Sequence, residues 1–546
     1  MTLMDRDLDV VVVGAGFAGI QAVHHLSRRG MRVRLLEAGE GVGGTWFWNR
    51  YPGARVDVES LEYSMDVVDD LQQEWEWSEK YAAQPEVCRY LNWVVDRLEL
   101  RSLMSFGHRL ESADFDRESR RWSVQVDVAG DRLRLRTTFL VLAVGYLSAA
   151  SFPTIAGLES FQGELLHTSA WPADGVDVVG RRVGLIGTAS SGVQVLQSIS
   201  ELVDDIYVFQ RTANWCLPLR NVPMDPDYQA WVKQNYAQIR RLERESRGPG
   251  MVLMAGEIAL PETRGAFEVT DAERAADFER RWAAGGVHMG RSFDDLMKDR
   301  RANDTLRDFL ARKIREAVKD PVTAGLLIPS HPPLTRRPPG EQGYYEAFNR
   351  PNVHLVDIRS NPIREIKPNG VHLEDGETLD LDVLICATGF DAGSGAVLRI
   401  DIAGPNGPLG AAWGEGVRTH LGLMVSGFPN LFLLNGPQSP APHFSPPLLS
   451  DFQARFICEL IDEMANRGAA LIHVTTRAQD EWVELVNRIY DSTLIAGTDS
   501  WWTGSNIPGK PRQAFAFAGG FTQYRDRALA AVEVGEIVFG EGVEAA

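Results

Sequence analysis

Residues 8–19 read LDVVVVGAGFAG, a β-branched run that ends in three spaced glycines, and the apolar pattern of residues 20–26 directly after them is helical. A buried strand, a G-x-G-x-x-G loop and a helix together form the arrangement that binds the pyrophosphate of a dinucleotide. In that arrangement Gly14 makes the turn, Gly16 lets the phosphates approach the backbone, and Gly19 lets the helix pack closely on the strand. This stretch therefore predicts a Rossmann-type α/β unit.

A carboxylate stands where the next strand of this unit should end. Residues 32–36 form a second apolar run, and Glu37 follows it, 23 residues after Gly14. An acid at this distance accepts hydrogen bonds from the diol of an adenosine ribose, whereas it repels a 2′-phosphate. The first unit is therefore expected to bind FAD or NAD rather than NADP.

A second unit of the same kind follows farther along the chain. Residues 182–186 form a strand-like run, residues 187–192 read GTASSG, and residues 193–199 have a helical pattern. Ala189 replaces the middle glycine, and its methyl group still permits a fairly close approach of phosphate. The residues expected to bind the dinucleotide here are Gly187, Thr188, Ser190, Ser191 and Gly192.

The charge at the end of the second unit is opposite to that of the first. Residues 206–210 form its next strand, and Arg211 and Thr212 follow, with Arg211 lying 24 residues after Gly187. A guanidinium and a hydroxyl suit a 2′-phosphate, which indicates NADP. A solvated surface arginine is the alternative for Arg211 taken alone, and the glycine loop before it decides in favour of an NADP site.

Two dinucleotide sites, one for FAD and one for NADP, are typical of flavoproteins that pass hydride between two domains. Strand-like segments at residues 139–145 and 381–389 indicate where the chain passes from one domain to the other. The expected fold class is α/β, with two Rossmann-like domains, the NADP domain being inserted in the FAD domain and carrying a helical insertion. The expected ranges are 1–145 and 388–546 for the FAD domain, 146–224 and 328–387 for the NADP domain, and 225–327 for the helical insertion.

The composition limits the partners. Acids outnumber bases, 74 against 56, and the formal net charge of −18 disfavours nucleic acid and anionic lipid surfaces. The four cysteines lie far apart in the sequence, so neither a zinc site nor a dithiol redox pair is expected, which excludes a disulfide reductase. No stretch has the apolar length of a membrane span, and the acidic N-terminus differs from a signal peptide, so a cytoplasmic protein is expected.

One segment between the two glycine loops identifies a family. Residues 161–172 read FQGELLHTSAWP and match every fixed position of F-x-G-x-x-x-H-x-x-x-W-P, so the chain resembles the type I Baeyer–Villiger monooxygenases. Residues 43–63, 336–345, 387–392 and 500–510 extend the resemblance over nearly the whole chain. Taken by itself the segment is typical of a linker, and His167 within it is expected to have a structural or conformational role.

The resemblance implies an enzyme that uses FAD, NADPH and O2 to insert one oxygen atom next to a ketone carbonyl. The product is an ester or lactone formed by way of a flavin C4a-peroxide, and sulfoxidation is implied as a side activity. Arg337 is implied as the cation over the flavin, oriented by Asp57. The further residues implied to contact FAD or NADP are Gly44, Thr45, Trp46, Asp57, Tyr63, Arg211, Thr212, Arg336, Arg337 and Trp501.

Several alternatives stay open. Without the family, Trp501 and the other aromatic residues would be assigned to the core, and Asp57 to the surface. The runner-up enzyme class oxygenates nitrogen or sulfur atoms from the same kind of intermediate, and a redox-silent nucleotide-binding protein is a third possibility. The ketone could be small cyclic, large cyclic, steroidal or linear, and the proline-rich loop at residues 438–447 (QSPAPHFSPP) is a candidate for setting its size.

Overall fold

The computed structural model describes residues 7–246 and 250–540. The two ends of the predicted FAD domain, residues 1–6 and 541–546, lie outside the described residues, as do residues 247–249 of the predicted helical insertion. Within the described ranges no helix combines the length and the apolar character needed to cross a lipid bilayer.

The larger sheet grows around the valine-rich strand that precedes the first glycine loop. β1 lies between β2 and β6 and is parallel to both, and its valines are buried on each face, as expected of a central parallel strand. The strand order is β20-β19-β4-β5-β6-β1-β2-β3, with β21 also paired to β6. The strands are β1 Asp7–Val13, β2 Val33–Glu37, β3 Met104–Phe106, β4 His108–Asp116, β5 Arg121–Val128, β6 Asp131–Leu142, β19 Asp401–Gly404, β20 Gly407–Pro408 and β21 Leu431–Leu433.

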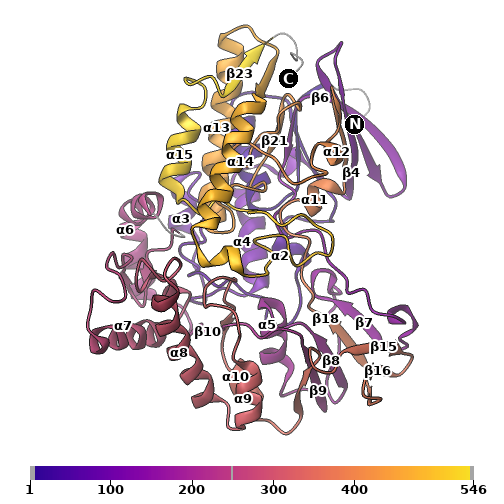
Figure 1. Ribbon diagram of the computed structural model, residues 1–546. Helices are drawn as coiled ribbons and strands as arrows, with labels where there is room; N and C mark the ends of the chain where they lie inside the picture. The colour runs from indigo at the N-terminus through magenta and orange to yellow at the C-terminus, as the bar shows by residue number, and fades with distance from the viewer. Residues whose placement is uncertain (1–6, 247–249, 541–546) are drawn as a thin grey trace.

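The helices that cover this sheet come from both ends of the chain. α1 (Phe17–Ser27) follows the glycine loop and packs against α13 (Pro446–Asn466), to which it is tied by a buried contact between His25 and Asp451. Figure 1 shows α13 beside α14 (Thr476–Asp491) and α15 (Phe521–Ala530) in the upper part of the molecule. The first glycine loop is therefore fixed between β1 and a helical layer built from distant segments.

The smaller sheet is fully parallel and lies in the lower part of Figure 1. Its order is β14-β9-β8-β18-β7, and α5 (Ser190–Ile199) follows β8 as the sequence predicts for the second glycine loop. The strands are β7 Glu164–His167, β8 Arg182–Ile186, β9 Asp205–Gln210, β14 Val353–Asp357 and β18 Val383–Cys386.

The interpretation of residues 161–172 as a linker was wrong in part. Four of these residues form β7, which pairs in parallel with β18 and completes the edge of the smaller sheet. Leu166 turns its side chain into the core while Leu165 is exposed, an alternation too short to stand out in the sequence. The segment thus belongs to the second sheet and does not merely connect two domains.

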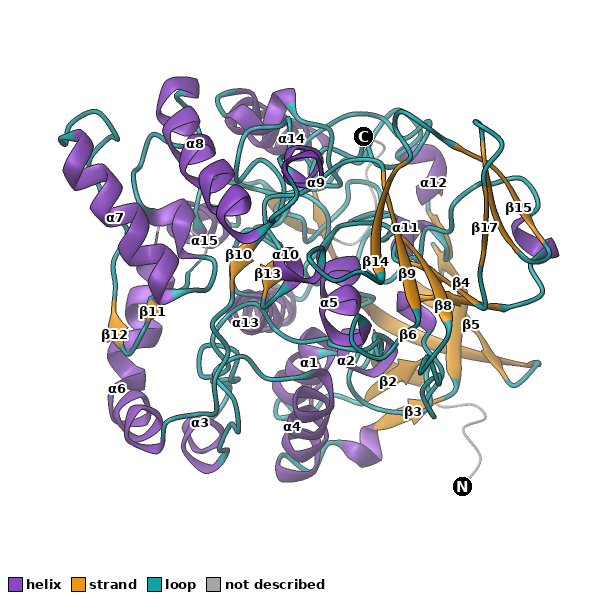
Figure 2. Cartoon of the chain, turned by 90° about the horizontal axis from the view of Figure 1, so that it is seen from below, coloured by secondary structure: helices purple, strands orange, loops and turns teal. Residues whose placement is uncertain are grey.

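Helices separate from the sheets dominate residues 225–327. Figure 2 shows α6, α7 and α8 gathered at one side of the molecule and the strands of the two large sheets at the other. The described part of this region contains four α-helices, α6 to α9. Each has a side-chain cap at its N-terminus, and the capping residues are, in chain order, Asp225, Thr270, Asp299 and Asp320. The helices are α6 Pro226–Glu245, α7 Asp271–Ala284, α8 Arg300–Ala317 and α9 Pro321–Leu327, with a hairpin of β11 Leu253–Met254 and β12 Glu257–Ile258 between α6 and α7.

The remaining elements are short or peripheral. They are α2 Thr45–Trp48, α3 Asp69–Glu74, α4 Gln84–Arg97, α10 Tyr344–Ala347, α11 Gly395–Leu398, α12 Leu409–Ala412, β10 Leu217–Pro218, β13 Gly340–Glu341, β15 Ile363–Lys367, β16 Gly370–Leu373, β17 Thr378–Asp380, β22 Leu471–Val474 and β23 Ile537–Gly540. Residues 329–339 contain no helix or strand, as their prolines predict. They lead directly into β13, which pairs with β10.

Candidate functional site

In the first glycine loop, the backbone leaves no space for a side chain at the positions where the dinucleotide-binding motif has glycine. Gly14 has a φ of +106°, and a Cβ there would lie 2.4 Å from the carbonyl oxygen of Ala143. A Cβ on Gly19 would lie 1.8 Å from the oxygen of Gly14, so this glycine lets α1 pack on the loop. Gly16 instead faces Gly44, whose own φ is +53°, and the two bare backbones oppose each other.

The N-terminus of α1 is suited to an anion. Within the described residues its N-cap, Gly16, provides no side-chain hydrogen bond, and the same is true of Ala189 at the start of α5. The four helices of the insertion all have such a cap. The first-turn N–H groups of α1 and α5 can therefore be satisfied by phosphate oxygens, which the helix dipole also favours. Both glycine loops fit the pyrophosphate of a dinucleotide.

Glu37 is held rigidly at the end of β2. Its two carboxylate oxygens accept hydrogen bonds from the backbone N–H groups of Ala15 and Gly39, each at 2.7 Å. A carboxylate oxygen can accept two hydrogen bonds, so each still has capacity for a ribose hydroxyl. This position is the one that the sequence assigns to the ribose of FAD.

The second glycine loop repeats the geometry of the first. Gly187 has a φ of +116°, and a Cβ there would lie 2.4 Å from the oxygen of Ala387. A Cβ on Gly192 would lie 2.0 Å from the oxygen of Gly187. Ala189, in the place of the middle glycine, has an extended backbone with φ of −88°, which any residue can adopt. The hydroxyl of Thr188 donates to the backbone oxygen of Thr212 at 2.8 Å, which joins the loop to the end of β9.

Arg211, predicted to bind a 2′-phosphate, and Arg336, implied to contact FAD or NADP, lie close enough for their charges to interact. Burial lowers the pKa of Arg336, and the neighbouring Arg211 lowers it further, while Asp499 opposes both. In the part of the chain that the structure describes, Nε of Arg336 is buried and has no hydrogen-bond acceptor. Two guanidinium groups close enough to repel each other, one with an unused donor, fit an anion placed between them.

Arg337 and Asp57 form a bidentate ion pair. Nε of Arg337 donates to Oδ2 of Asp57 at 2.9 Å, and Nη2 donates to Oδ1 at 2.6 Å. The Asp57 carboxylate raises the pKa of Arg337 in spite of the burial of the guanidinium. The side chain of Arg337 is 35% exposed and that of Asp57 is 20% exposed. The pair is therefore fixed in geometry, its guanidinium stays charged, and it is still accessible to a ligand.

The loop that carries Arg337 is held from several sides. The amide of Asn214 donates to the backbone oxygen of Arg337 at 3.2 Å, and Nδ2 of Asn303 in α8 donates to the oxygen of Pro333 at 3.0 Å. The hydroxyl of Thr498 donates to that of Thr335 at 2.9 Å, and both residues are buried. The Thr498 contact brings the segment with Trp501 against the segment with Arg337, a juxtaposition that no motif in the sequence indicates.

Trp501 lies partly buried beside other aromatic rings. Its ring centroid is 6.0 Å from that of Tyr146 and 5.6 Å from that of Trp502. The loop around Trp501 is attached to the segment that follows β18, because Nζ of Lys510 contacts Oδ1 of Asp391 at 2.5 Å. The aromatic neighbours of Trp501 are those expected of a core residue, the alternative for this position. The Thr335–Thr498 hydrogen bond in addition holds the segment of Trp501 against the loop that carries Arg337.

An aromatic wall, formed by Phe17, Trp46 and Tyr63, extends from the first glycine loop to Arg337. Nε1 of Trp46, in α2, donates to the hydroxyl of Tyr63 at 3.1 Å, and the Tyr63 ring meets Phe17 at the start of α1 edge-on at 4.8 Å. Burial raises the pKa of Tyr63 to about 12, and Asp57 and Arg337 lie close enough to affect it. The structure therefore brings Trp46, Tyr63, Asp57 and Arg337 together, and these residues, with Thr45 beside Trp46, are among those that the resemblance implies for FAD or NADP.

His167 connects residues 161–172 to the point where the chain leaves the second sheet. Its Nδ1 lies 2.7 Å from Oγ of Ser169, and its Nε2 lies 3.3 Å from Oγ1 of Thr388. The imidazole is buried, and burial lowers its pKa. A neutral histidine with both nitrogens in contact with hydroxyls suits the structural role predicted for it.

His443, in the proline-rich loop, is closer to the site than the sequence alone indicates. Its Nε2 lies 2.6 Å from the hydroxyl of Tyr490, and its ring packs edge-on against Trp502 at 4.6 Å. Burial, with the nearby charge of Arg337, lowers the pKa of His443 to about 4. Tyr490 and Trp502 were missed in the sequence, where they are ordinary core aromatics at a distance from any motif.

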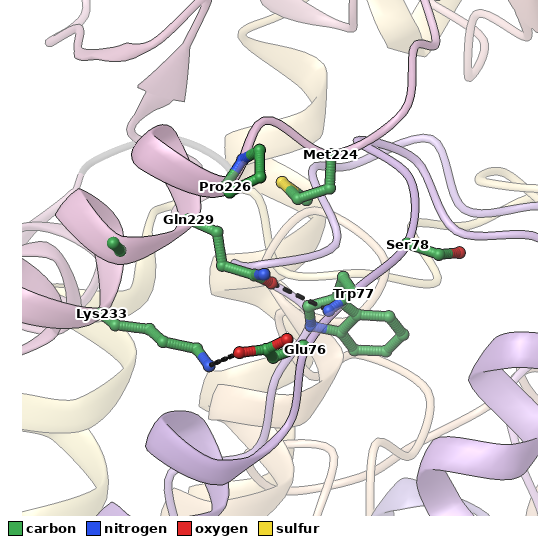
Figure 3. Close-up of a pocket in the computed structure, with 8 residues that line it drawn as sticks. Glu76, Trp77, Ser78, Met224, Pro226, Gln229 and Lys233 are labelled. Atoms are coloured by element: carbon green, nitrogen blue, oxygen red, sulfur yellow. Dashed lines mark hydrogen bonds and ion pairs between the residues drawn. The ribbon is translucent and has the colours of Figure 1, made fainter.

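A surface pocket of about 430 Å³ lies elsewhere and takes no part in this site. Figure 3 shows that it lies between residues 76–78 and α6, with Gln229 hydrogen-bonded to the backbone of Trp77. Lys233 contacts Glu76 and donates to the backbone oxygen of Gln73. Because these polar groups already have partners, the pocket offers little to a ligand.

The chain matches known proteins in both sequence and structure. The model of an NAD(P)-binding Rossmann-like domain matches residues 12–70, and that of L-lysine 6-monooxygenase/L-ornithine 5-monooxygenase matches residues 69–237. The 2-oxo-Δ3-4,5,5-trimethylcyclopentenylacetyl-CoA monooxygenase of Pseudomonas putida is 40% identical, over 95% of this chain and 96% of that protein.

A Baeyer–Villiger monooxygenase of Pseudooceanicola batsensis is 38% identical, over 97% of this chain and 95% of that protein. A crystal structure described as OTEMO in complex with FAD and NADP superimposes with a TM-score of 0.92 at 38% identity, over 98% of this chain and 99% of that one. The likeness therefore extends over the whole length and includes both nucleotide-binding units.

Proposed function

The chain belongs to the Baeyer–Villiger monooxygenases, and from this premise we propose a role for each residue of its site. The protein is an FAD- and NADPH-dependent monooxygenase that converts a ketone to an ester or lactone with O2. Bound FAD supplies the capacity to accept hydride from NADPH and to activate dioxygen. The single observation that carries the assignment of the working site is the bidentate ion pair between Arg337 and Asp57.

FAD binding is assigned to the first unit and its aromatic wall. The loop backbone and the N-terminus of α1 would hold the pyrophosphate, and Glu37 would hold the ribose. This proposal is supported by the bare glycine surfaces and by the fixed carboxylate. The residues assigned to FAD are Gly14, Gly16, Gly19, Glu37, Gly44, Thr45, Trp46, Asp57, Tyr63 and Arg337.

NADP binding is assigned to the second unit, where Arg211 and Arg336 would flank the 2′-phosphate. The paired cations and the unused donor of Arg336 support this reading. The residues assigned to NADP are Gly187, Thr188, Ser190, Ser191, Gly192, Arg211, Thr212, Arg336 and Trp501. The two separate sheets support the division into an FAD domain (1–145 and 388–546), an NADP domain (146–224 and 328–387) and a helical insertion (225–327).

The chemistry that this chain contributes is electrostatic. The Arg337 guanidinium would hold negative charge on the attacking oxygen and polarise the ketone carbonyl, and a donor fixed in advance lowers the barrier most. Asp57 occupies Nε and Nη2, which sets the plane of the guanidinium and leaves other N–H groups for the reacting atoms. The surrounding aromatic rings would exclude water, which strengthens these interactions.

A competition experiment tests this function. A cyclic ketone, a thioether and a primary amine are offered together to the purified enzyme with NADPH and air, and the products are identified. Lactone as the main product is expected, with sulfoxide as a minor one. The match of residues 69–237 to an N-oxygenating family favours hydroxylated amine as the alternative product. Hydroxylamine as the main product would replace the proposed function by that alternative.

Arg336→Ala should reduce the preference for NADPH over NADH. A charge-assisted hydrogen bond to phosphate is lost, so we expect the ratio of the two kcat/KM values to fall about tenfold or more. The ratio is measured by NADPH and NADH oxidation with the same ketone. Arg182→Ala is the matched control, because Arg182 begins β8 at the end opposite the glycine loop and pairs with Asp382. A ratio unchanged in Arg336→Ala would contradict the phosphate assignment.

A further inference from the structure

A buried arginine in the helical insertion has no acceptor for its hydrogen bonds. Arg291 closes a short 3-10 turn, His288–Arg291, between α7 and α8, and is 5% exposed. Among the described residues, Nε, Nη1 and Nη2 are all buried without a hydrogen-bond partner. Burying a guanidinium without an acceptor costs free energy of folding. An arginine at this position is therefore expected to serve a function other than packing.

Two further polar atoms of this region also lack partners, one of them on His288, which lies close enough to Arg291 to be affected by its charge. The hydroxyl of Tyr81 and Nδ1 of His288 are buried, and neither has a hydrogen-bond partner in the described part of the chain. The Tyr81 hydroxyl and the Cδ2–Nε2 edge of the His288 ring both face Gly286, because a Cβ added there would be 2.5 Å from the hydroxyl, 3.2 Å from Cδ2 and 3.3 Å from Nε2. Burial, with Arg291 nearby, lowers the pKa of His288 to about 3, so its imidazole is neutral.

Glu62, the carboxylate that acts on the charge of Arg291, already has other partners, as do Glu59 and Asp277. Oε1 of Glu62 accepts from the backbone N–H groups of Val252 and Leu253, and burial raises its pKa well above the usual range. Glu59 contacts Nζ of Lys80 at 3.3 Å and accepts from the hydroxyl of Tyr228 at 2.7 Å. Asp277 accepts from Nε of Arg281 at 2.8 Å. The charge of Arg291 is thus not balanced by any direct ion pair with a described residue.

This group of donors borders the Arg337–Asp57 site. A Cβ added to Gly290 would lie 3.4 Å from Cδ1 of Leu334, and Leu334 precedes Arg337 by three residues. On the other side, Asp57 lies close enough to Tyr81 to contribute, after burial, Glu59 and Glu62, to the raised pKa of its hydroxyl. Arg291 therefore lies where the insertion packs against the loop that carries Arg337.

We propose that Arg291, together with the hydroxyl of Tyr81 and the imidazole of His288, binds the carboxylate of the substrate, so that the enzyme acts on keto acids. The unpaired atoms of Arg291 can only donate, and a carboxylate offers two oxygens that match a guanidinium in bidentate fashion. Arg337 is a poor candidate for this task, because the N–H groups that Asp57 leaves free are assigned to the reacting atoms. The inference rests on the proposed function, since it names the class of ketone that this site oxidises.

The test compares a keto acid with its own neutral ester. Holoenzyme is assayed with 4-oxocyclohexanecarboxylate and its methyl ester, and lactone formation gives kcat/KM for each. The wild type should prefer the acid, and in Arg291→Met the ratio of acid to ester should fall about 30-fold, the loss typical of removing one partner of a buried charge pair. Arg291→Lys keeps a cation and should retain part of the preference.

Arg281→Met is the matched control. Arg281 is also buried in α7 but is paired with Asp277, so its loss should lower the melting temperature and leave the acid-to-ester ratio unchanged. Arg291→Met should instead keep or raise the melting temperature, because it removes an unbalanced buried charge. A melting temperature lowered as much as in Arg281→Met would show that Arg291 has an internal partner and would overturn the proposal.

Three other outcomes are decisive. Equal kcat/KM values for acid and ester in the wild type, or an unchanged ratio in Arg291→Met, would overturn the carboxylate site while the oxygenation of ketones stands. Competitive inhibition by acetate that Arg291→Met abolishes, without any preference for the keto acid, would assign the site to a separate small anion and overturn the substrate class. Failure to oxygenate either ketone would count against the proposed function itself.

Discussion

Arg337→Ala should still bind FAD but lose ester formation. The loss expected is at least ~3 kcal/mol of barrier, comparable to the removal of one oxyanion donor. The physical reason is that the neighbouring cation, Arg336, lies toward Arg211 of the second unit, whereas the charge of Arg337 is fixed by two bonds to Asp57. The measurement is ester formed per NADPH consumed, with hydrogen peroxide determined in parallel.

Arg337→Lys is the control that separates charge from geometry. Lysine keeps a positive charge at this point but cannot make the two parallel bonds to Asp57, so its activity should lie between that of the wild type and that of the alanine variant. Yellow protein with an unchanged flavin content is required of both variants. Normal oxygenation by Arg337→Ala would mean that the working cation lies elsewhere.

The fold was predictable where the decisive interactions are local. Strands β1, β2, β8 and β9 and the two helices after the glycine loops lie where the sequence places them, within a few residues. Each glycine loop is specified by a steric requirement within a stretch of six residues, for example the approach of Gly19 to the oxygen of Gly14. Such requirements are visible in the sequence because they depend on few residues.

The contacts that complete the site are not local, and the sequence did not indicate them. Thr335 and Thr498 lie 163 residues apart, and their buried hydrogen bond is one of two unremarkable hydroxyls. β7 was taken for part of a linker because only four residues form it, and its strand character depends on pairing with β18. Arg291 gives no signal at all in the sequence, since its lack of partners is a property of the folded chain.

The two nucleotide units show how one geometry can serve two cofactors. Gly14 and Gly187 have nearly the same φ, +106° and +116°, and a Cβ added to either would lie 2.4 Å from a carbonyl oxygen. The difference lies in the residue at the end of the second strand, a carboxylate held by two backbone N–H groups in one unit and a guanidinium in the other. Electrostatics, and not the fold, therefore decides which dinucleotide each unit accepts.

Asp57→Ala should reduce ester formation about 100-fold, because a small displacement of a catalytic group is enough for such a loss. The charge of Arg337 would persist, because arginine stays protonated at any working pH even without the carboxylate that raises its pKa here. In the wild type, the raised pKa of Arg337 stabilises the ion pair at every pH below the ordinary pKa of arginine. The guanidinium is therefore charged across the whole neutral range. The loss would therefore reflect orientation and not deprotonation of Arg337.

This distinction can be measured. The pH dependence of kcat/KM between about pH 7 and 10 should keep its shape in Asp57→Ala, because arginine stays protonated there. The free energy of unfolding should fall by about 1–3 kcal/mol, less than for a fully buried pair because the ion pair is partly accessible. Asp57→Asn keeps one acceptor without the charge and should recover part of the activity. A new ionisation near pH 8 to 9 in Asp57→Ala would show that Asp57 acts on the charge of the site and not on its geometry.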